Sequence, residues 1–123
     1  MFINFTNHPA AQWSDAQRAA AQRYGKVIDL AFPAIDPEAD ETALDSMAAA
    51  YVHHIVRLNP DAVLCQGEST FVYRVVCRLQ GQGIPVLAAC SRREVQTTIR
   101  PDGSTLRQSV FTFAGFRSYG TPP

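Results

Sequence analysis

With 123 residues and a formal net charge of zero, the chain has the size of one domain (residues 1–123) and can bury a core without metals or disulfides. It shows no charged leader before an apolar run, and no apolar stretch reaches the roughly 18 residues that cross a bilayer. We therefore expect a cytoplasmic protein with no membrane partner. The three cysteines, Cys65, Cys77 and Cys90, form no CxxC pair, so we predict no disulfide framework, no metal site and no cofactor.

The charge is unevenly distributed along the chain. Residues 1–61 carry four basic and eight acidic side chains, whereas residues 62–123 carry seven basic and three acidic ones. Because the chain as a whole is neutral, we predict no duplex nucleic acid as a partner. Ten of the eleven basic residues are arginine, which reflects either codon bias or arginines placed for bidentate contact with phosphates.

The N-terminal segment predicts a strand followed by a helix. Residues 2–5 alternate apolar and polar side chains, as a strand does, and Pro9 ends the segment. Ser14 and Gln17 have the spacing of a capping box, which begins a helix that runs to Tyr24. Gly25 then ends the helix.

The next segment repeats this order. Residues 27–32 predict a second strand, and a loop covers residues 33–39. A long helix then begins either at Asp36-Pro37 or at Asp40, because both positions carry helix-start signals. Asn59-Pro60 ends that helix.

The third unit begins with a continuous apolar run over residues 62–65, which is typical of a central parallel strand. A polar turn over residues 66–70 leads into a helix with Ser69 or Thr70 as its N-cap. The helix is predicted to bury Phe71, Val72, Val75, Val76 and Leu79. A fourth apolar strand covers residues 84–89.

The β-α-β-α-β-α-β order predicts an α/β fold, with a Rossmann-like, mostly parallel sheet and helices on both faces. The C-terminal segment differs, since residues 94–100 and 105–116 read as two strands around the tight turn at 101–104. We predict that this antiparallel β-hairpin lies at a sheet edge or across a dimer contact.

In open parallel sheets, ligands bind beyond the carboxyl ends of the strands, near helix N-termini. Polar side chains follow the predicted strands there. They are Asn7 and His8 after the first strand; Gln66, Gly67, Glu68, Ser69 and Thr70 after the third; and Ser91, Arg92 and Arg93 after the fourth. None of these segments is a P-loop or a GxGxxG motif, so nothing favours a nucleoside triphosphate or NAD.

Each of these residues has a structural alternative. His8 could transfer a proton, because an imidazole titrates near neutral pH, or it could only hold its loop by a hydrogen bond. The turn hydroxyls could bind phosphate or cap the helix, and Arg92-Arg93 could bind phosphate or lie in a solvated loop. Trp13 could stack on a base or serve as a hydrophobic staple.

The other histidines and cysteines have simpler interpretations. His53 and His54 are expected to be solvated on the second helix. Cys65 and Cys90 end apolar strands and are read as small core residues. Cys77 points away from the apolar face of the third helix, together with Tyr73, which indicates a second contact surface.

Three segments, taken in order, carry a resemblance that spans nearly the whole chain. They are Phe2-Ile3-Asn4-Phe5-Thr6-Asn7-His8-Pro9, Leu64-Cys65-Gln66-Gly67-Glu68-Ser69-Thr70 and Ala88-Ala89-Cys90-Ser91. In these segments the chain resembles the small, single-domain, CARF-related proteins of type III CRISPR systems, some of which are ring nucleases.

The resemblance implies a homodimer that binds a cyclic oligoadenylate and cleaves it without a metal ion. The ring size that it favours is the tetra-adenylate. A ribose 2′-hydroxyl would attack the adjacent phosphorus, with the reacting atoms held in line. His8, Ser69 and Ser91 are the predicted catalytic residues. The predicted ligand-binding residues are Asn7, Trp13, Gln66, Gly67, Glu68, Thr70, Arg92 and Arg93.

Two other functions remain open. A non-catalytic sensor of the same ligand would use the same residues to bind and position it. A nucleoside-processing enzyme would use Glu68 as a carboxylate nucleophile, which requires Glu68 to face the ligand.

Overall fold

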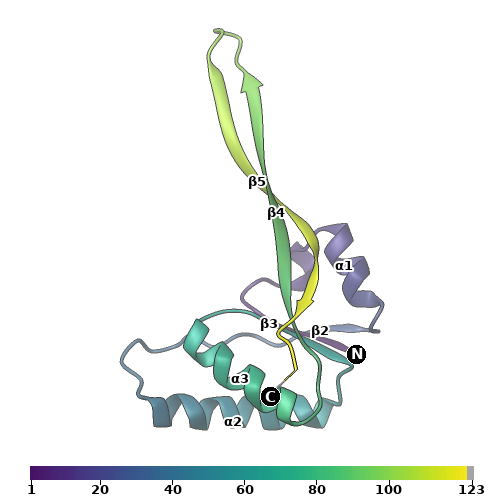
Figure 1. Ribbon diagram of the computed structural model, residues 1–123, viewed down its shortest axis with the longest axis vertical. Coiled ribbons are helices and arrows are strands. Elements are labelled where there is room, and N and C mark those ends of the chain that lie inside the picture. The colour runs from purple at the N-terminus through teal and green to yellow at the C-terminus, as the bar shows by residue number, and fades with distance from the viewer. Residues whose placement is uncertain (122–123) are drawn as a thin grey trace.

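A computed structural model describes residues 1–121, and its centre is one five-stranded sheet (Figure 1). The strand order is β2-β1-β3-β4-β5. The strands are β1 (Phe2–Phe5), β2 (Val27–Asp29), β3 (Ala62–Cys65), β4 (Val86–Ile99) and β5 (Thr105–Ser118). The first four run parallel, and β5 pairs antiparallel with β4. The predicted α/β class, parallel sheet and hairpin at the sheet edge are confirmed.

Side chains cap the start of each of the three α-helices. The helices are η1 (Ala10–Gln12), α1 (Asp15–Gln22), α2 (Glu41–Leu58) and α3 (Ser69–Gly81). Ser14 Oγ accepts from the Gln17 amide at 3.2 Å, as the capping box predicts. Asp40 caps α2 by accepting from the Ala43 amide at 2.8 Å, which decides between the two predicted starts. The predicted cap of α3 is wrong, because Glu68 takes that place.

Helices cover both faces of the sheet (Figure 1). On one face, α2 and α3 pack over the larger core, which contains Phe5, Val63 and Phe71. On the other face, α1 contributes to a smaller core around Phe2 and Leu64. The strands β1 and β3 are buried along their whole length, and α3 buries the five residues predicted for it.

The C-terminal half of the sheet differs most from the expectation. The strand predicted to end at residue 89 continues to Ile99, so the loop expected at Ser91-Arg92-Arg93 is wrong. Cross-strand pairing runs from Leu87↔Ser118 to Ile99↔Thr105, with one register shift between Cys90 and Ser91. Because β5 folds back along the whole of β4, backbone groups that a loop would expose to water are paired instead. The second strand is shorter than predicted and ends at Asp29.

We call residues 91–111 the arm and the rest of the described chain the body. The arm projects from the body as a long twisted ribbon (Figure 1). Almost all of its side chains are exposed. At its base, the register shifts between Cys90 and Ser91, and Ala114 of β5 is left without a partner. Among residues 1–121, no helix has both the length and the apolar character needed to cross a membrane.

Candidate functional site

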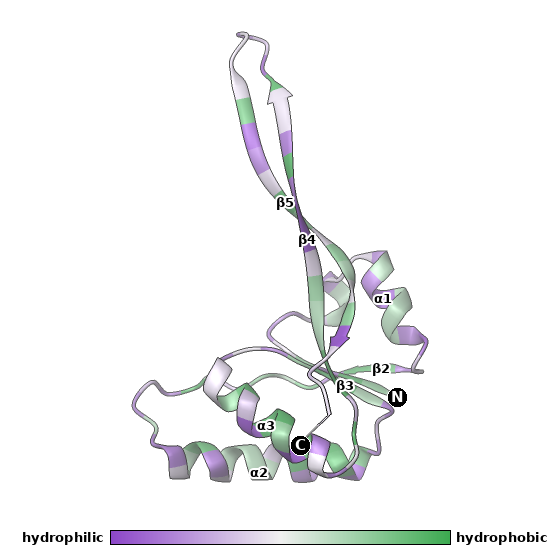
Figure 2. Ribbon diagram, in the orientation of Figure 1, coloured by the Kyte–Doolittle hydropathy of each residue, from purple (hydrophilic) through white to green (hydrophobic). Residues whose placement is uncertain are grey.

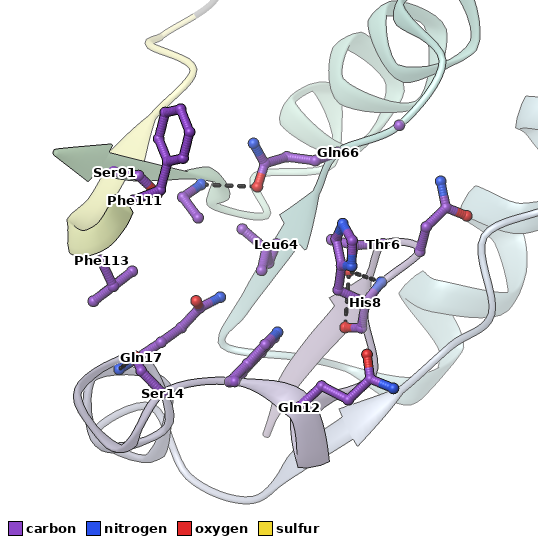
Figure 3. Close-up of a pocket in the computed structure, with 14 residues that line it drawn as sticks. Thr6, His8, Gln12, Ser14, Gln17, Leu64, Gln66, Ser91, Phe111 and Phe113 are labelled. Atoms are coloured by element: carbon purple, nitrogen blue, oxygen red, sulfur yellow. Dashed lines mark hydrogen bonds between the residues drawn. The ribbon is translucent and has the colours of Figure 1, made fainter. Parts of the chain in front are cut away.

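A pocket of about 490 Å³ lies beyond the carboxyl ends of β1 and β3, on the same side of the sheet as α1 (Figure 3). In the sheet, β2 lies on one side of β1 and β3 lies on the other, so the direction of strand addition reverses at β1. Open α/β sheets bind ligands at such topological switch points. The pocket is lined by Thr6, Asn7, His8, Gln12, Trp13, Ser14, Gln17, Leu64, Gln66, Gly67, Ala89, Ser91, Phe111 and Phe113. Six of the eleven predicted site residues are therefore brought together.

The buried side chain of Asn4, in β1, holds the loop after this strand in place, and Asn4 is only 1% exposed. Its Nδ2 donates to the His8 carbonyl and to Asp29 Oδ1, both at 2.8 Å. Its Oδ1 accepts from the Thr6 hydroxyl at 2.8 Å, and Thr6 Oγ1 accepts from the His8 amide at 3.1 Å. The backbone of His8 is thus fixed by the side chains of Asn4, in β1, and Thr6, just after it.

His8 itself lines the pocket, and Figure 3 shows its ring across the cavity from Gln17 and Phe113. The structural hydrogen bonds of this residue come from its backbone, so its imidazole is left to face the cavity. Among the described residues that line the pocket, His8 is the one with a titratable side chain. Any proton transfer by the protein at this site would therefore fall to His8.

Trp13 forms one wall of the pocket and is only 9% exposed. Its ring meets Phe2 edge-on, with centroids 6.3 Å apart. A hydrophobic staple would instead pack on the fourth residue of the helix, which is Arg18. Arg18 donates to the Trp13 carbonyl at 3.2 Å, and the indole packs in the smaller core with Phe2, on the pocket side of the sheet.

Gln66 and Gly67 enter the pocket from the turn after β3. The Gln66 Oε1 accepts from the Ala89 amide at 3.1 Å, which ties this turn to β4. A Cβ on Gly67 would stand 2.4 Å from the Phe32 ring. The glycine is thus needed for packing against Phe32, a reason that the sequence did not show.

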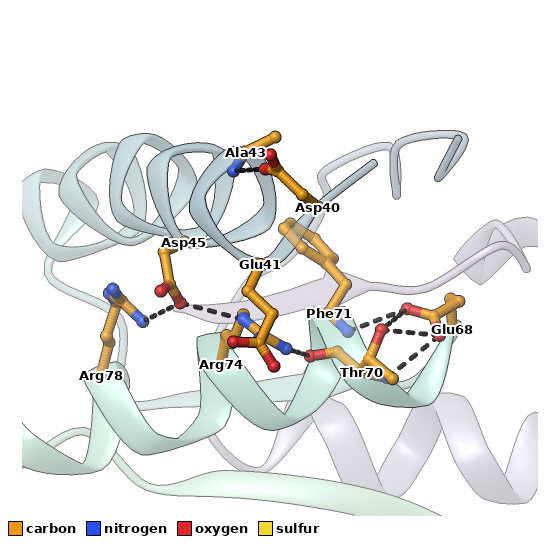
Figure 4. A network of polar contacts seen from close by, with 9 residues as sticks. All are labelled: Asp40, Glu41, Ala43, Asp45, Glu68, Thr70, Phe71, Arg74 and Arg78. Atoms are coloured by element: carbon orange, nitrogen blue, oxygen red, sulfur yellow. Dashed lines mark hydrogen bonds and ion pairs between the residues drawn. The ribbon is translucent and has the colours of Figure 1, made fainter. Parts of the chain in front are cut away.

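Glu68 caps α3 and Thr70 lies in the first turn of that helix (Figure 4). Neither residue lines the pocket. The Glu68 carboxylate accepts from the amides of Thr70 and Phe71, at 3.1 and 2.9 Å, and from the Thr70 hydroxyl at 2.7 Å. These hydrogen bonds hold the pKa of Glu68 below its ordinary value. A negative charge therefore already occupies the helix N-terminus where a phosphate would bind.

Ser69 lies on the other side of the same turn. It lines a second cavity of about 310 Å³, together with Tyr73 and Tyr119, and not the pocket that holds His8. Cys77 and Tyr73 are exposed on α3, as expected. Farther along this helix, Arg74 pairs with Asp45 at 2.9 Å and Arg78 with the same carboxylate at 3.7 Å (Figure 4). These ion pairs join α3 to α2.

Arg92 and Arg93 lie in the β4 part of the arm, where consecutive side chains point to opposite faces. Arg93 shares a face with Ser91, a pocket residue, and its guanidinium donates to Ser109 Oγ at 2.9 Å. Arg92 points to the other face. The two arginines therefore cannot serve the pocket equally.

Sequence reasoning missed five polar residues that build this site: Asn4, Thr6, Gln12, Ser14 and Gln17. For Asn4 a signal was present, because it is the polar member of an otherwise apolar strand, Phe2-Ile3-Asn4-Phe5. Gln12, Ser14 and Gln17 precede or begin a surface helix. Only the packing of that helix against the sheet, where it contacts β5, makes them pocket residues.

The cysteines give a prediction on pH. Burial raises the pKa of the Cys65 thiol to about 12, while an unfolded thiol titrates near 8.5. Between these values the unfolded chain has lost a proton that the folded chain keeps, so stability falls as pH rises, by up to about 1.4 kcal/mol per pH unit. Urea titrations from pH 8 to 10.5 should show a smaller loss of stability for Cys65→Ala than for the unchanged protein. Cys77→Ala is the control, and equal losses in all three proteins would contradict the prediction.

The fold and the pocket together define a small α/β protein with a cavity at the switch point of its sheet. Residues 1–117 match the family model described as the uncharacterized protein MJ1673 family, and the chain belongs to that family. No curated protein matches the chain.

Proposed function

We propose that this protein binds a cyclic oligoadenylate, with cyclic tetra-adenylate as the first ligand to test, and opens the ring without metal, as a ring nuclease of type III CRISPR systems. The observation that carries the proposal is the pocket itself. It combines side-chain amides, one indole, one imidazole and serine hydroxyls at the switch point of the sheet.

The lining of the pocket suits a purine base better than a bare phosphate. Asn7, Gln12, Gln17 and Gln66 carry amides, which pair well with the N6 and N7 edge of adenine. Trp13 and Phe113 offer ring surfaces on which a base can stack. Since His8 is the one titratable residue in this lining, phosphate charge would have to be met at the pocket rim.

The proposed cleavage needs few protein groups. The 2′-oxygen attacks the neighbouring phosphorus as its proton leaves, the bond from phosphorus to the 5′-oxygen breaks, and that oxygen takes up a proton. The products are a 2′,3′-cyclic phosphate and a 5′-hydroxyl. His8 would accept or donate one of these protons, and the Ser91 hydroxyl would donate to a phosphoryl oxygen.

The size of the ligand supports the proposed homodimer. One pocket of about 490 Å³ holds only part of a four-nucleotide ring. A tetra-adenylate ring has two-fold symmetry, and a two-fold dimer would present the same pocket to each half of the ring.

A non-catalytic sensor is the second candidate, and it is favoured by a specific observation. Catalysis would depend on the single titratable side chain of the lining, whereas binding needs only the amides and rings. The third function, with Glu68 as a nucleophile, gains no such support. The carboxylate of Glu68 caps α3 and is turned away from the pocket.

The test is incubation with labelled cyclic oligoadenylates of several ring sizes, in EDTA, followed by chromatography. Binding is followed separately by the fluorescence of Trp13, the single tryptophan of the chain. We expect one ring size to bind and be opened, and its 2′-methoxy analogue to bind and stay intact. Tight binding with no cleavage would favour the sensor. No binding of any ring would refute the proposal.

The two adjacent arginines allow a sharper prediction. Arg93→Ala should weaken binding of the ring by about 1–3 kcal/mol, because a charge-assisted contact to phosphate is lost on the pocket face of the arm. Arg92→Ala should leave binding nearly unchanged, since Arg92 lies on the opposite face. Isothermal titration calorimetry on both variants measures this difference. Equal effects would show that the face of the arm does not matter.

A further inference from the structure

The arm has two chemically different faces. Cross-strand partners share a face, so the register places Arg93, Val95, Thr97, Ile99, Thr105, Arg107, Ser109 and Phe111 together, and we call this set the arm strip. Val95, Ile99 and Phe111 are 53%, 77% and 68% exposed, and the strip holds no acidic residue. The opposite face mixes Arg92 and Glu94 with neutral polar side chains, and its two apolar residues, Leu106 and Val110, are partly buried. Figure 2 shows apolar and polar residues interspersed along both strands of the arm.

The arm has little to stabilise it within a single chain. A two-stranded ribbon without a covering layer is only marginally stable in water. In the described part of the chain, β3 pairs with β4 only as far as Leu87, so beyond that point β4 has β5 as its one neighbour. Open edges and exposed aliphatic side chains call for a partner. Valine and isoleucine indicate a protein surface, because nucleic acids are bound by basic and aromatic side chains.

The charge distribution favours a second copy of this chain as that partner. The arm carries four arginines and two acidic residues, although the whole chain is neutral, so the body is acidic. An arm of one copy is therefore attracted to the body of another.

The position of the pocket sets the geometry. Ser91, Phe111 and Phe113 line the pocket and lie on the same face as the arm strip. In a two-fold dimer with the strips turned inward, each arm then faces the pocket side of its partner. The lining contains no arginine or lysine, whereas the strip has Arg93 and Arg107.

We infer that the arm is a dimerisation element, which packs its strip on a second copy of this chain and covers that copy's pocket. The ligand site would then be built from two chains, with arginines of one arm at the rim of the other's pocket. The inference rests on the homodimer of the proposed function and does not need its ligand.

The first test is light scattering on the protein alone over a range of concentrations. We expect a dimer, and we expect Val95→Ser/Ile99→Ser to raise its dissociation constant about tenfold or more, because the apolar contact is lost. Gln96→Ser/Thr98→Ser, on the opposite face of the same strand, is the matched control and should stay dimeric. Thermal unfolding of both variants shows whether the body remains folded. An unchanged protein that is monomeric throughout, or a dimer indifferent to the strip substitutions, would overturn the inference.

Hydrogen exchange tests whether the arm covers the pocket. Peptides over residues 6–17, which are part of the body, should lose protection when the strip variant or simple dilution separates the chains. A dimer whose dissociation leaves this segment unchanged would overturn the covering of the pocket. A dimer that behaves as expected but binds no cyclic oligoadenylate supports the inference and refutes the proposed function. A monomer that binds and cleaves the ring does the reverse.

Discussion

Replacing His8 with alanine is expected to lower the single-turnover rate of ring opening by about 10²-fold or more, with affinity unchanged within a few-fold. His8 is the titratable residue of the pocket lining, and its backbone hydrogen bonds to Asn4 and Thr6 do not involve the imidazole. The loop should therefore keep its shape while proton transfer is lost. Rapid-quench kinetics with labelled cyclic tetra-adenylate, together with a binding titration, measures both quantities.

His53→Ala is the matched control, because His53 is an exposed histidine of α2 that lies outside this pocket. The His53→Ala variant should open the ring at the same single-turnover rate as the unchanged protein. A normal rate in His8→Ala would remove His8 from the mechanism. A loss of affinity as large as the loss of rate would mean that His8 binds the ring and does not act in the chemical step.

Replacing Asn4 with alanine is expected to lower the free energy of unfolding by about 2–3 kcal/mol, and with it the Tm by about 10 °C. The substitution removes one hydrogen-bond partner each from the His8 carbonyl, Asp29 Oδ1 and the Thr6 hydroxyl, in a strand that is buried throughout. Chemical and thermal unfolding measure the change. The loop after β1 should lose its fixed shape at the same time.

Two further variants test this account of Asn4. Asn7→Ala, in the exposed part of the same loop, should leave the Tm nearly unchanged. Asn4→Asp is nearly isosteric, but its carboxylate cannot donate to Asp29 and places a second negative charge beside it. It should therefore be as harmful as alanine near neutral pH. A stable Asn4→Asp variant would show that the hydrogen bonds are not what holds the loop.

The body of the molecule was predictable from sequence because its elements are buried in a regular way. The strands Phe2–Phe5 and Ala62–Cys65 have the predicted bounds, and the core face of α3 follows from its apolar spacing. The exceptions are the early end of β2 at Asp29 and the cap of α3. Serine and threonine are the commoner N-caps, but Glu68 has the longer side chain and reaches two amides at once.

The arm was harder to predict because its strands lack the usual pattern. Alternation of apolar and polar side chains identifies a strand when one face is buried, and residues 91–99 are exposed on both faces. Ser91, Arg92 and Arg93 therefore looked like a loop. The pocket was located correctly by the rule for parallel sheets, whereas its glutamines depend on where α1 packs, which no local signal encodes.

The bulge at the base of the arm determines which side chains of β5 point into the pocket, because one extra residue reverses the faces that the following side chains take. In a regular strand, Phe113 and Phe116 would point to opposite faces, because they are separated by an odd number of positions. The unpaired Ala114 changes that parity, and the two rings come together with centroids 5.1 Å apart. Phe111, Phe113 and Phe116 then share one face, which runs from the core at Phe2 to the pocket and on to the arm. A chain without Ala114 would form a more regular ladder, yet it would turn the arm's aromatic residues away from the pocket.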